Sequence, residues 1–399
     1  HMGDINDPMM LCALGGVDID ELDCEGILAK LGFGAHEIAS DHLAVEPPSW
    51  RGDIVGEACL VEEVLRLGGY DRIPAVPLKI GAALPGLAQS PQGRRRQQAR
   101  RRLAARGMVE AVTYSFLAAA DAARFGEVPT SVRLVNPISA DLDVMRPSLL
   151  PNLLRAAGRN AARGMADAAL YEVGPQFAGD APEDQAQVAA GLRIGRIGGR
   201  HWAGPARPVD AFDAKADAMA VLAELGIDTD RLQVVTEAPG YYHPGRSGAI
   251  RQGPKVVLAH FGELHPGVLA GMDVAGPAAA FEVYLDNLPQ PKARKGTARP
   301  ALALSPYQKV ERDFAFVVDA AVAAGDVVAA VRGAGKALIA DVGVFDVFTG
   351  ASLGDGKKSL AVGVTLQPAE HTLTDAEIEV VSQRIVDNVR QKTGATLRA

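Results

Sequence analysis

The sequence predicts an α+β protein composed of several domains. Its 399 residues exceed the roughly 100 to 200 residues of one domain. Proline-rich segments divide the chain, and helix and strand patterns follow each other without the regular repeat of a parallel α/β sheet. An apolar fraction of 48% and a charged fraction of 22% are typical of globular proteins. No apolar run approaches the ~20 residues of a membrane helix, so we expect a cytoplasmic protein with no membrane contact.

The proline-rich joints predict the domain boundaries. Residues 1–6, which begin with His1-Met2, are expected to be a leader outside the fold. The other predicted parts are a small α/β module at 7–76, a connector at 77–91, a core at 92–288, a linker at 289–306 and a C-terminal domain at 307–399. The cysteines, Cys12, Cys24 and Cys59, form no CxxC pair, so neither a disulfide framework nor a cysteine zinc site is predicted.

The first module is predicted to contain two helices and a short strand. One helix is expected from Cys24 to Leu31 and a strand from Leu43 to Val45. The second helix is expected from Glu57 to Leu67, because Gly68-Gly69 follows and glycine commonly ends a helix in the left-handed conformation.

Carboxylates gather at the start of this second helix. Asp53 precedes it, and Cys59, Glu62 and Glu63 stand at positions i, i+3 and i+4 along it. Three carboxylates without a histidine suit Mg²⁺, which prefers oxygen ligands. The alternative is a solvated acidic face, with Glu57 stabilising the helix N-terminus.

The middle block is predicted to form a mixed, largely antiparallel sheet with helices. Val112, Tyr114 and Phe116 alternate with small or polar residues, which indicates a half-buried strand. A helix is expected after MRPSLLPNLL, and the further strands at residues 168–173, 249–250, 256–261 and 279–284. A helix with seven arginines, Arg94 to Arg106, precedes them; it is either a solvated face or a surface that meets RNA or another subunit.

No catalytic residue is predicted. His243, His260 and His265 lack metal-ligand spacing and an identifiable partner nucleophile or base. The segments GAGK and GDGKKS lack the glycine that a phosphate-binding loop requires. GDGKKS is instead predicted to be a hairpin turn, with Asp355-Gly356 at positive φ.

The last block has the clearest pattern. Phe314, Phe316 and Val318 alternate as a strand, and a helix from Asp326 to Arg332 follows. Strands are expected at 339–348 and 359–366, and a final helix opens with the capping box that begins at Thr374. The resulting order β-α-β-β-α-β is that of the ferredoxin-like fold. The paired surface aromatics that many RNA-binding modules use for stacking are not evident in the pattern.

Several segments together resemble one protein family. They are PSWRGDIVGEACLVEEVLRLGGY, NPISADLDVMRPSLLPNLL, YEVGPQF, HPGRSG, ERDFAFVV, VFDVFTG and GKKSLAVGVTLQ. In this order they resemble the B5 module, the catalytic-like core and the anticodon-binding (FDX-ACB) domain of the beta subunit of bacterial phenylalanyl-tRNA synthetase. The resemblance implies a class II synthetase-like antiparallel core without an active site. It also implies that the family's N-terminal tRNA-binding module and B3/B4 editing domain are absent from this sequence.

The resemblance also implies function, partners and site residues. The parent enzyme attaches phenylalanine to tRNA(Phe) with ATP and Mg²⁺ at the active site of an alpha subunit, in an (αβ)2 heterotetramer. Metal ligands are implied at Asp53, Glu62 and Glu63, whereas Cys59 stands at the fourth ligand position, where a thiol would weaken the site. The candidate tRNA-binding residues are Lys309, Arg312, Lys357, Lys358 and Arg398. A non-catalytic RNA-binding protein and a purely structural assembly module remain open alternatives.

Overall fold

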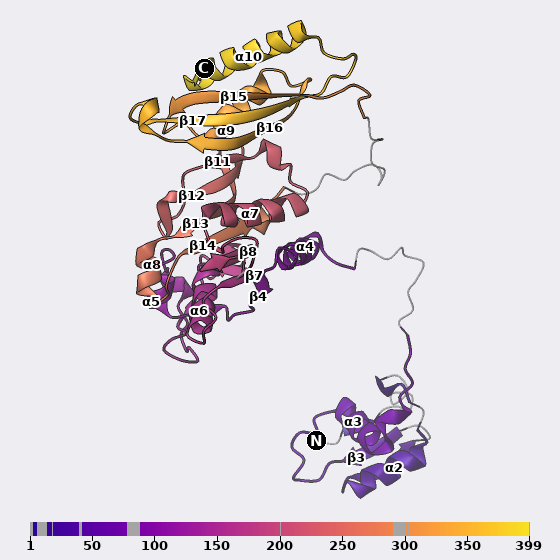
Figure 1. Cartoon of the computed structure of the whole chain (residues 1–399). Coiled ribbons are helices and arrows are strands. Elements are labelled where there is room, and N and C mark those ends of the chain that lie inside the picture. The colour runs from indigo at the N-terminus through magenta and orange to yellow at the C-terminus, as the bar shows by residue number, and fades with distance from the viewer. Residues whose placement is uncertain are drawn as a thin grey trace. The chain divides into compact units, whose positions relative to one another are not determined.

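A computed structural model describes residues 3–5, 14–17, 19–39, 42–77, 88–199, 201–289, 301 and 304–398. The chain divides into two compact units, 1–88 and 89–399 (Figure 1). This division falls within the connector predicted at 77–91, and the linker at 289–306 lies mostly outside the described residues. The leader expected at 1–6 is not entirely outside the fold, because Gly3–Ile5 form a strand that pairs with His42–Glu46. Among the described residues, no helix has both the length and the apolar character that a membrane crossing requires.

The N-terminal unit packs two helices against a three-stranded antiparallel sheet. Its elements are β1 (Gly3–Ile5), α2 (Glu21–Lys30), β2 (Gly34–Ala39), β3 (His42–Glu46), α3 (Glu57–Gly68) and the 3-10 turn η2 (Tyr70–Arg72), and the strand order is β1-β3-β2. Both predicted helices and the predicted strand are confirmed. Leu28, Leu60 and Val64 are buried at the centre of the core because the two helices place them on their inner faces. Gly69 ends α3 with φ 102°, and its N–H donates to the Leu65 carbonyl at 2.9 Å.

The second unit contains a seven-stranded sheet. Its strands are β4 (Val109–Glu110), β7 (Ala168–Phe177), β8 (Gln185–Ile194), β11 (Gln233–Val235), β12 (Tyr242–Gln252), β13 (Val256–Leu264) and β14 (Ala278–Tyr284). The strand order is β11-β12-β13-β14-β8-β7-β4, and all neighbours are antiparallel except β4 and β7, which are parallel. The predicted mixed, largely antiparallel sheet is therefore confirmed.

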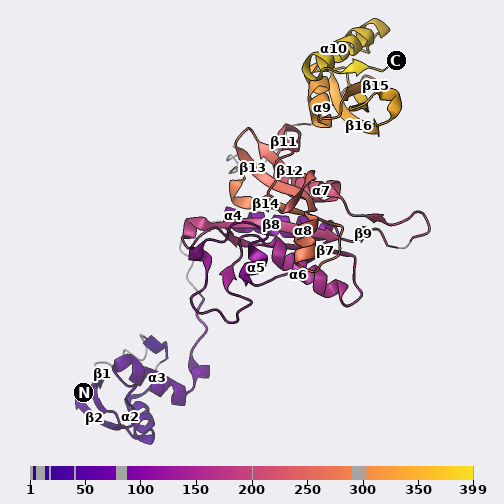
Figure 2. The same ribbon diagram turned by 90° about the vertical axis from the view of Figure 1, so that its left-hand side faces the viewer.

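Helices cover both faces of this sheet (Figure 2). The helices are α4 (Pro91–Ala105), α5 (Ala119–Ala122), α6 (Leu150–Ala161), α7 (Ala211–Glu224) and α8 (Pro266–Gly271). Leu103 of α4 and Val221 of α7 belong to the apolar cluster on one face. Leu153 of α6 and Leu269 of α8 belong to the cluster on the other face. Short strands complete the unit as the pairs β5 (Phe116–Leu117) with β6 (Val144–Met145) and β9 (Arg196–Ile197) with β10 (Arg207–Pro208).

The strand predicted through Val112, Tyr114 and Phe116 is wrong for most of its length. The N–H of Ala111 still donates to the Tyr171 carbonyl at 2.8 Å, and the chain then leaves the sheet. Val112 and Tyr114 are exposed, and only Phe116 enters a strand, β5. The alternation in this segment therefore reflects a loop with two outward-facing apolar side chains, and no pleated strand runs through it.

The C-terminal domain has the predicted ferredoxin-like order. Its elements are β15 (Val310–Asp319), α9 (Ala324–Gly333), β16 (Ile339–Phe348), β17 (Lys357–Leu366), α10 (Asp375–Thr393) and β18 (Thr396–Leu397). The sheet order is β16-β17-β15-β18, and both helices pack on one face of it. The capping box at Thr374 is confirmed. The predicted turn before β17 exists, but the 3-10 turn η7 (Ala351–Leu353) makes the connection longer than a two-residue hairpin. Positive φ angles occur at Gly354 and Gly356, whereas Asp355 does not have one.

Candidate functional site

The centre of the seven-stranded sheet is closed and polar. Glu282 on β14 is completely buried, and four neutral groups donate to its carboxylate: Ser148 Oγ at 2.7 Å, Gln176 Nε2 at 3.0 Å, Tyr241 OH at 2.7 Å and Tyr242 OH at 3.3 Å. Burial raises the pKa values of Tyr241 and Tyr242 well above the ordinary value of a tyrosine. Both phenols therefore stay protonated and act as hydrogen-bond donors to Glu282. Every described partner in this network is internal, which indicates a structural role.

A buried ion pair lies beside this network. Arg146 Nη1 is 2.8 Å from Glu172 Oε1, and the two side chains are 1% and 5% exposed. Arg146 also donates to the Pro175 carbonyl at 2.9 Å and to Thr113 Oγ1 at 3.0 Å. Arg146 is thus committed to neighbours within the fold, and it is not available to a substrate phosphate. No local pattern in the sequence indicates this contact, because Arg146 and Glu172 are 26 residues apart.

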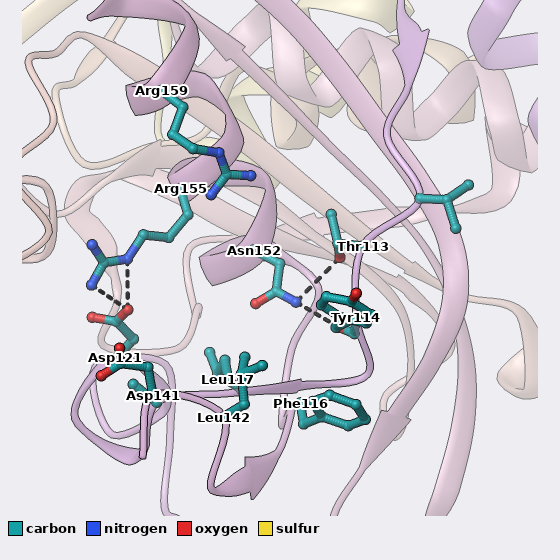
Figure 3. Close-up of a pocket in the computed structure, with 12 residues that line it drawn as sticks. Thr113, Tyr114, Phe116, Leu117, Asp121, Asp141, Leu142, Asn152, Arg155 and Arg159 are labelled. Carbon is teal, nitrogen blue, oxygen red and sulfur yellow. Dashed lines mark hydrogen bonds and ion pairs between the residues drawn. The ribbon is translucent and has the colours of Figure 1, made fainter. Parts of the chain in front are cut away.

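A cavity of about 830 Å³ opens beside α6. In Figure 3, Tyr114 and Phe116 line one side, Asn152, Arg155 and Arg159 of α6 another, and Asp121 pairs with Arg155. The rings of Tyr114 and Phe116 stack in parallel with centroids 5.4 Å apart. Asn152 Nδ2 donates to the Tyr114 carbonyl at 2.6 Å, which fixes the loop against the helix. The lining combines carboxylates and arginines with an exposed aromatic rim, and such a rim is typical of a contact surface.

The three histidines have separate local roles. His260 Nδ1 lies 2.8 Å from Tyr284 OH, and burial lowers its pKa to about 4. His243 Nδ1 accepts from the Gly245 N–H at 3.1 Å, and His265 Nδ1 accepts from the Gly267 N–H at 3.0 Å at the start of α8. Each of the three histidines thus contacts a neighbouring group of the fold.

Two arginines of the segment from Arg94 to Arg106 have structural contacts. Arg95 is buried and donates to the carbonyls of Leu285 and Leu288 at 3.3 and 3.1 Å. Arg106, just after the helix, pairs with the fully buried carboxylate of Asp217 on α7. The sequence predicts a solvated face or a macromolecular surface, because no local pattern shows which arginines contact carbonyls and carboxylates that are distant in sequence. Arg94 and Arg101 remain exposed.

The carboxylates predicted as metal ligands meet arginines in the N-terminal unit. Arg51 Nε and Nη2 donate to the two oxygens of Asp53 at 2.8 and 2.7 Å, and Nη2 also donates to Glu63 Oε1 at 2.8 Å. Arg66 Nη2 donates to Glu63 Oε2 at 2.6 Å. Hydrogen bonds from Arg51 lower the pKa of Asp53 to about 2 and also lower the pKa of Glu63. Glu62 is exposed on the adjacent helix face.

These residues fit a magnesium ion poorly. The Cys59 thiol lies 3.9 Å from the backbone carbonyl of Asp53, and a thiol is a poor Mg²⁺ ligand. No cluster of three or more His, Cys, Asp or Glu side chains suited to a metal is present in the described part of the chain. The magnesium site at Asp53, Glu62 and Glu63 therefore stays a prediction that the donor geometry does not favour.

The structure does not bring the candidate tRNA-binding residues into one patch. Lys309 and Arg312 lie at the start of β15, which has ten residues, and Lys357 and Lys358 pair with its far end. The two ends are roughly 30 Å apart at about 3.3 Å per residue. Lys309 Nζ contacts Glu311 at 2.6 Å, and Lys358 Nζ donates to the Ala320 carbonyl at 2.8 Å.

Arg398 lies beside exposed aromatic side chains of the C-terminal sheet. Its guanidinium carbon is 5.5 Å from the ring centroid of Phe348, and its backbone N–H donates to the Ala315 carbonyl at 2.7 Å. Phe348 is in register with Ser359 and Val317, on the sheet face opposite α9 and α10, and the ring of Phe345 lies beside Gly363 on the same face. Both phenylalanines are exposed. The expectation that surface aromatics are missing is therefore corrected, because a β-bulge between Val344 and Asp346 places Phe348 on the same face as Phe345, although the two are three residues apart.

Comparison with known proteins places this architecture in one family. The phenylalanyl tRNA synthetase beta chain CLM domain matches residues 74–285, more than half of the chain. The chain belongs to the phenylalanyl-tRNA synthetase beta chain family. The tRNA synthetase B5 domain of that family matches residues 7–70, and the ferredoxin-fold anticodon binding domain matches residues 305–398.

Curated relatives in the beta chain family are similar throughout this chain. A phenylalanine--tRNA ligase beta subunit from Paramagnetospirillum magneticum is 54% identical over 98% of this chain and 49% of the relative. Those from Rhodospirillum rubrum and Brucella melitensis are 53% and 52% identical, over 98% and 96% of this chain and 49% and 48% of the relatives. The chain thus spans about half the length of the curated relatives that it matches. A solved pyrrolysyl tRNA synthetase from Desulfitobacterium hafniense matches 58% of this chain and 74% of that chain at 16% identity, with a TM-score of 0.38 that is too low to support a conclusion.

Proposed function

We propose that this chain supplies the assembly and tRNA-binding functions of a phenylalanine--tRNA ligase whose active site lies on an alpha subunit. The observation that carries the proposal is the sealed sheet of the second unit. Apolar clusters cover both of its faces, and Glu282, Glu172 and Arg146 are satisfied by internal partners. Because these buried charged groups bind internal partners, the sheet suits a subunit that supports catalysis elsewhere.

An exposed apolar surface supports contact with a protein partner. Five apolar side chains of β4, the chain that follows it and the loop before β6 are at least 65% exposed, and we propose that they form one surface: Val109, Val112, Tyr114, Val135 and Ile138. Clusters of exposed apolar residues mark interaction sites more often than scattered single ones do. We assign this surface, defined by these five residues, to the alpha subunit within an (αβ)2 heterotetramer, a cytoplasmic enzyme that uses ATP and Mg²⁺ at the alpha active site.

The second contribution is binding of the tRNA(Phe) anticodon region by the C-terminal domain. Unpaired bases stack on exposed aromatic rings, and an arginine contributes charge and a planar stacking group. Phe345, Phe348 and Arg398 supply this combination on the sheet face opposite the helices. Lys357 lies at one end of the same sheet, where it can meet the phosphate backbone.

Reconstitution tests the proposal. The chain is mixed with its cognate alpha subunit, complex formation is followed by size-exclusion chromatography with light scattering, and phenylalanylation of tRNA(Phe) is assayed. We expect a heteromeric complex with activity that neither chain has alone. The double variant Val135→Asp/Ile138→Asp should prevent assembly, whereas Val380→Asp, at an exposed apolar position on α10, is the matched control.

Two results would overturn the proposal. Phenylalanyl adenylate formation by the pure chain would place a catalytic site within it. A wild-type chain that forms no complex with alpha, yet binds RNA tightly with a steep salt dependence, would favour the RNA-binding alternative, because phosphate contacts release counterions.

A further inference from the structure

Arg51 occupies the point on which the carboxylates of the N-terminal unit converge. The segment before α3 folds back, so that Arg51 contacts Asp53 two residues later and Glu63 on the second turn of the helix. The contact with Asp53 is bidentate, which is the strongest geometry between a guanidinium and a carboxylate. One side chain thereby joins the loop to α3.

Every carboxylate oxygen of this pair has a guanidinium donor. Arg51 contacts both oxygens of Asp53 and Oε1 of Glu63, and Arg66 contacts Oε2 of Glu63 at 2.6 Å. Two cations therefore balance two anions. A divalent ion at the same point would have to displace the arginines or add two further positive charges beside them.

The surroundings of Arg51 are also built for a guanidinium. Its central carbon lies 5.7 Å from the ring centroid of the buried Phe33, within the range of a cation–π contact. Its side chain is 23% exposed, whereas that of Glu63 is 11% exposed, so the contact between them is largely shielded from solvent. Mg²⁺ requires near-octahedral oxygen coordination at about 2.0–2.1 Å, and an aromatic ring and a thiol do not supply it.

We propose that Arg51 takes the place of a divalent cation in this unit, so that the loop before α3 is held by a covalently attached charge and the unit folds without Mg²⁺. The ion pairs among Arg51, Asp53, Glu63 and Arg66 are the structural site in question. This proposal goes beyond the function proposed above and does not depend on it, because no measurement below uses the alpha subunit, tRNA or aminoacylation.

The test uses the full chain with one fluorescent reporter. The sequence has two tryptophans, so Trp202→Phe leaves Trp50, the residue next to Arg51, as the only one. The Trp50 ring lies over Gly32, 3.3 Å from the point where a Cβ would stand, so its emission reports the position of the loop. This reporter chain is titrated with Mg²⁺ at constant ionic strength, and free Mn²⁺ is counted in parallel by electron paramagnetic resonance.

We expect neither a saturable change in Trp50 emission nor loss of free Mn²⁺, and chelator should leave the thermal midpoint of the Trp50 signal unchanged. Cys59→Asp, which adds a hard ligand while Arg51 remains, should behave in the same way. The double variant Arg51→Gln/Cys59→Asp should bind Mn²⁺, because the carboxylates then lack their cation. The reporter chain, Cys59→Asp and Arg51→Gln/Cys59→Asp differ only at residues 51 and 59.

Two outcomes would overturn the proposal. One is saturable binding of Mg²⁺ or Mn²⁺ to the reporter chain that Asp53→Asn abolishes. The other is a folded Arg51→Gln/Cys59→Asp variant that leaves all Mn²⁺ free. In that case the carboxylates would not bind a metal ion even without Arg51, so Arg51 could not be said to replace one. If that variant does not fold, the chelator experiment on the reporter chain decides by itself, since a lowered thermal midpoint would refute metal-independent folding.

Discussion

Replacing Arg146 by methionine should destabilise the second unit severely. The change keeps an unbranched side chain of similar length and removes the charge that faces Glu172. Glu172 would keep its hydrogen bond from Thr113 Oγ1 at 2.7 Å but would remain a buried, uncompensated anion. Removing one partner of a buried pair is costly for this reason, even where the intact pair itself contributes little.

The geometry sets the size of the effect. At the observed separation of 2.8 Å, the direct attraction is about 6 kcal/mol with an effective dielectric constant of about 20. Desolvation offsets part of it, and breaking a buried pair typically costs about 3–5 kcal/mol. At about 1.4 kcal/mol per factor of ten, amide exchange in β7 and β8 should accelerate by roughly two to three and a half orders of magnitude.

Hydrogen exchange with mass spectrometry on residues 168–194 measures this effect without interference from the other domains. Arg231→Met is the matched control, because its pair with Asp228 has side chains 85% and 58% exposed and should contribute at most about 1 kcal/mol. Adding Glu172→Gln to Arg146→Met should recover stability, because it removes the stranded charge. Equal effects of Arg146→Met and Arg231→Met, or no recovery in the double variant, would refute the reasoning.

Three further predictions follow from described contacts. Gly191→Ala should destabilise the sheet by about 1–3 kcal/mol through overpacking, because the new Cβ would stand 2.4 Å from the Phe281 ring. Urea unfolding measures the change in stability, and the control is Gly343→Ala, where a Cβ meets nothing within 4 Å. Phe348→Ala should weaken binding of an anticodon stem-loop by about 1–3 kcal/mol, the usual loss of one stacked base, while Lys309→Ala changes little; equal losses in a fluorescence-anisotropy assay would contradict this. The pKa of Asp53 is lowered from 3.8 to about 2, so its ion pair stabilises the N-terminal unit fully above pH 3.8, and this stabilisation is lost as the pH falls through about 2. An acid titration of Trp50 emission should therefore show a transition in this pH range that is absent from Asp53→Asn.

Sequence patterns predicted the C-terminal domain best and the middle of the chain worst. Leu360, Val362 and Val364 alternate with small or polar residues, so one face of β17 was visible in the sequence. In β8 the residues Val188, Ala189 and Ala190 are all buried, because the sheet is covered on both faces, and this leaves no alternation to detect. The 14-residue helix α7 was missed for a similar reason, since alanines make up much of its buried face.

The candidate sites were predictable only where contacts are local. Spacing along α3 correctly brought Glu63 near Asp53, but which cation joins them depends on how the preceding loop folds back. The partners of Arg146 and Arg95 are 26 and about 190 residues away, so no motif in the sequence could indicate them. The placement of Phe345 and Phe348 on one face depends on a bulge in β16, which the alternation of the strand does not reveal.

The place of β14 in the seven-stranded sheet has a consequence for synthesis of the protein. β14 is the last of these strands to leave the ribosome, yet it lies between β13 and β8 and joins the two groups of strands already made. Until it pairs, a nascent chain presents two unpaired strand edges, and such edges invite association with other chains. Chains that terminate before Ala278 should therefore aggregate, whereas chains that end after Leu288 complete the sheet and lack only the C-terminal domain.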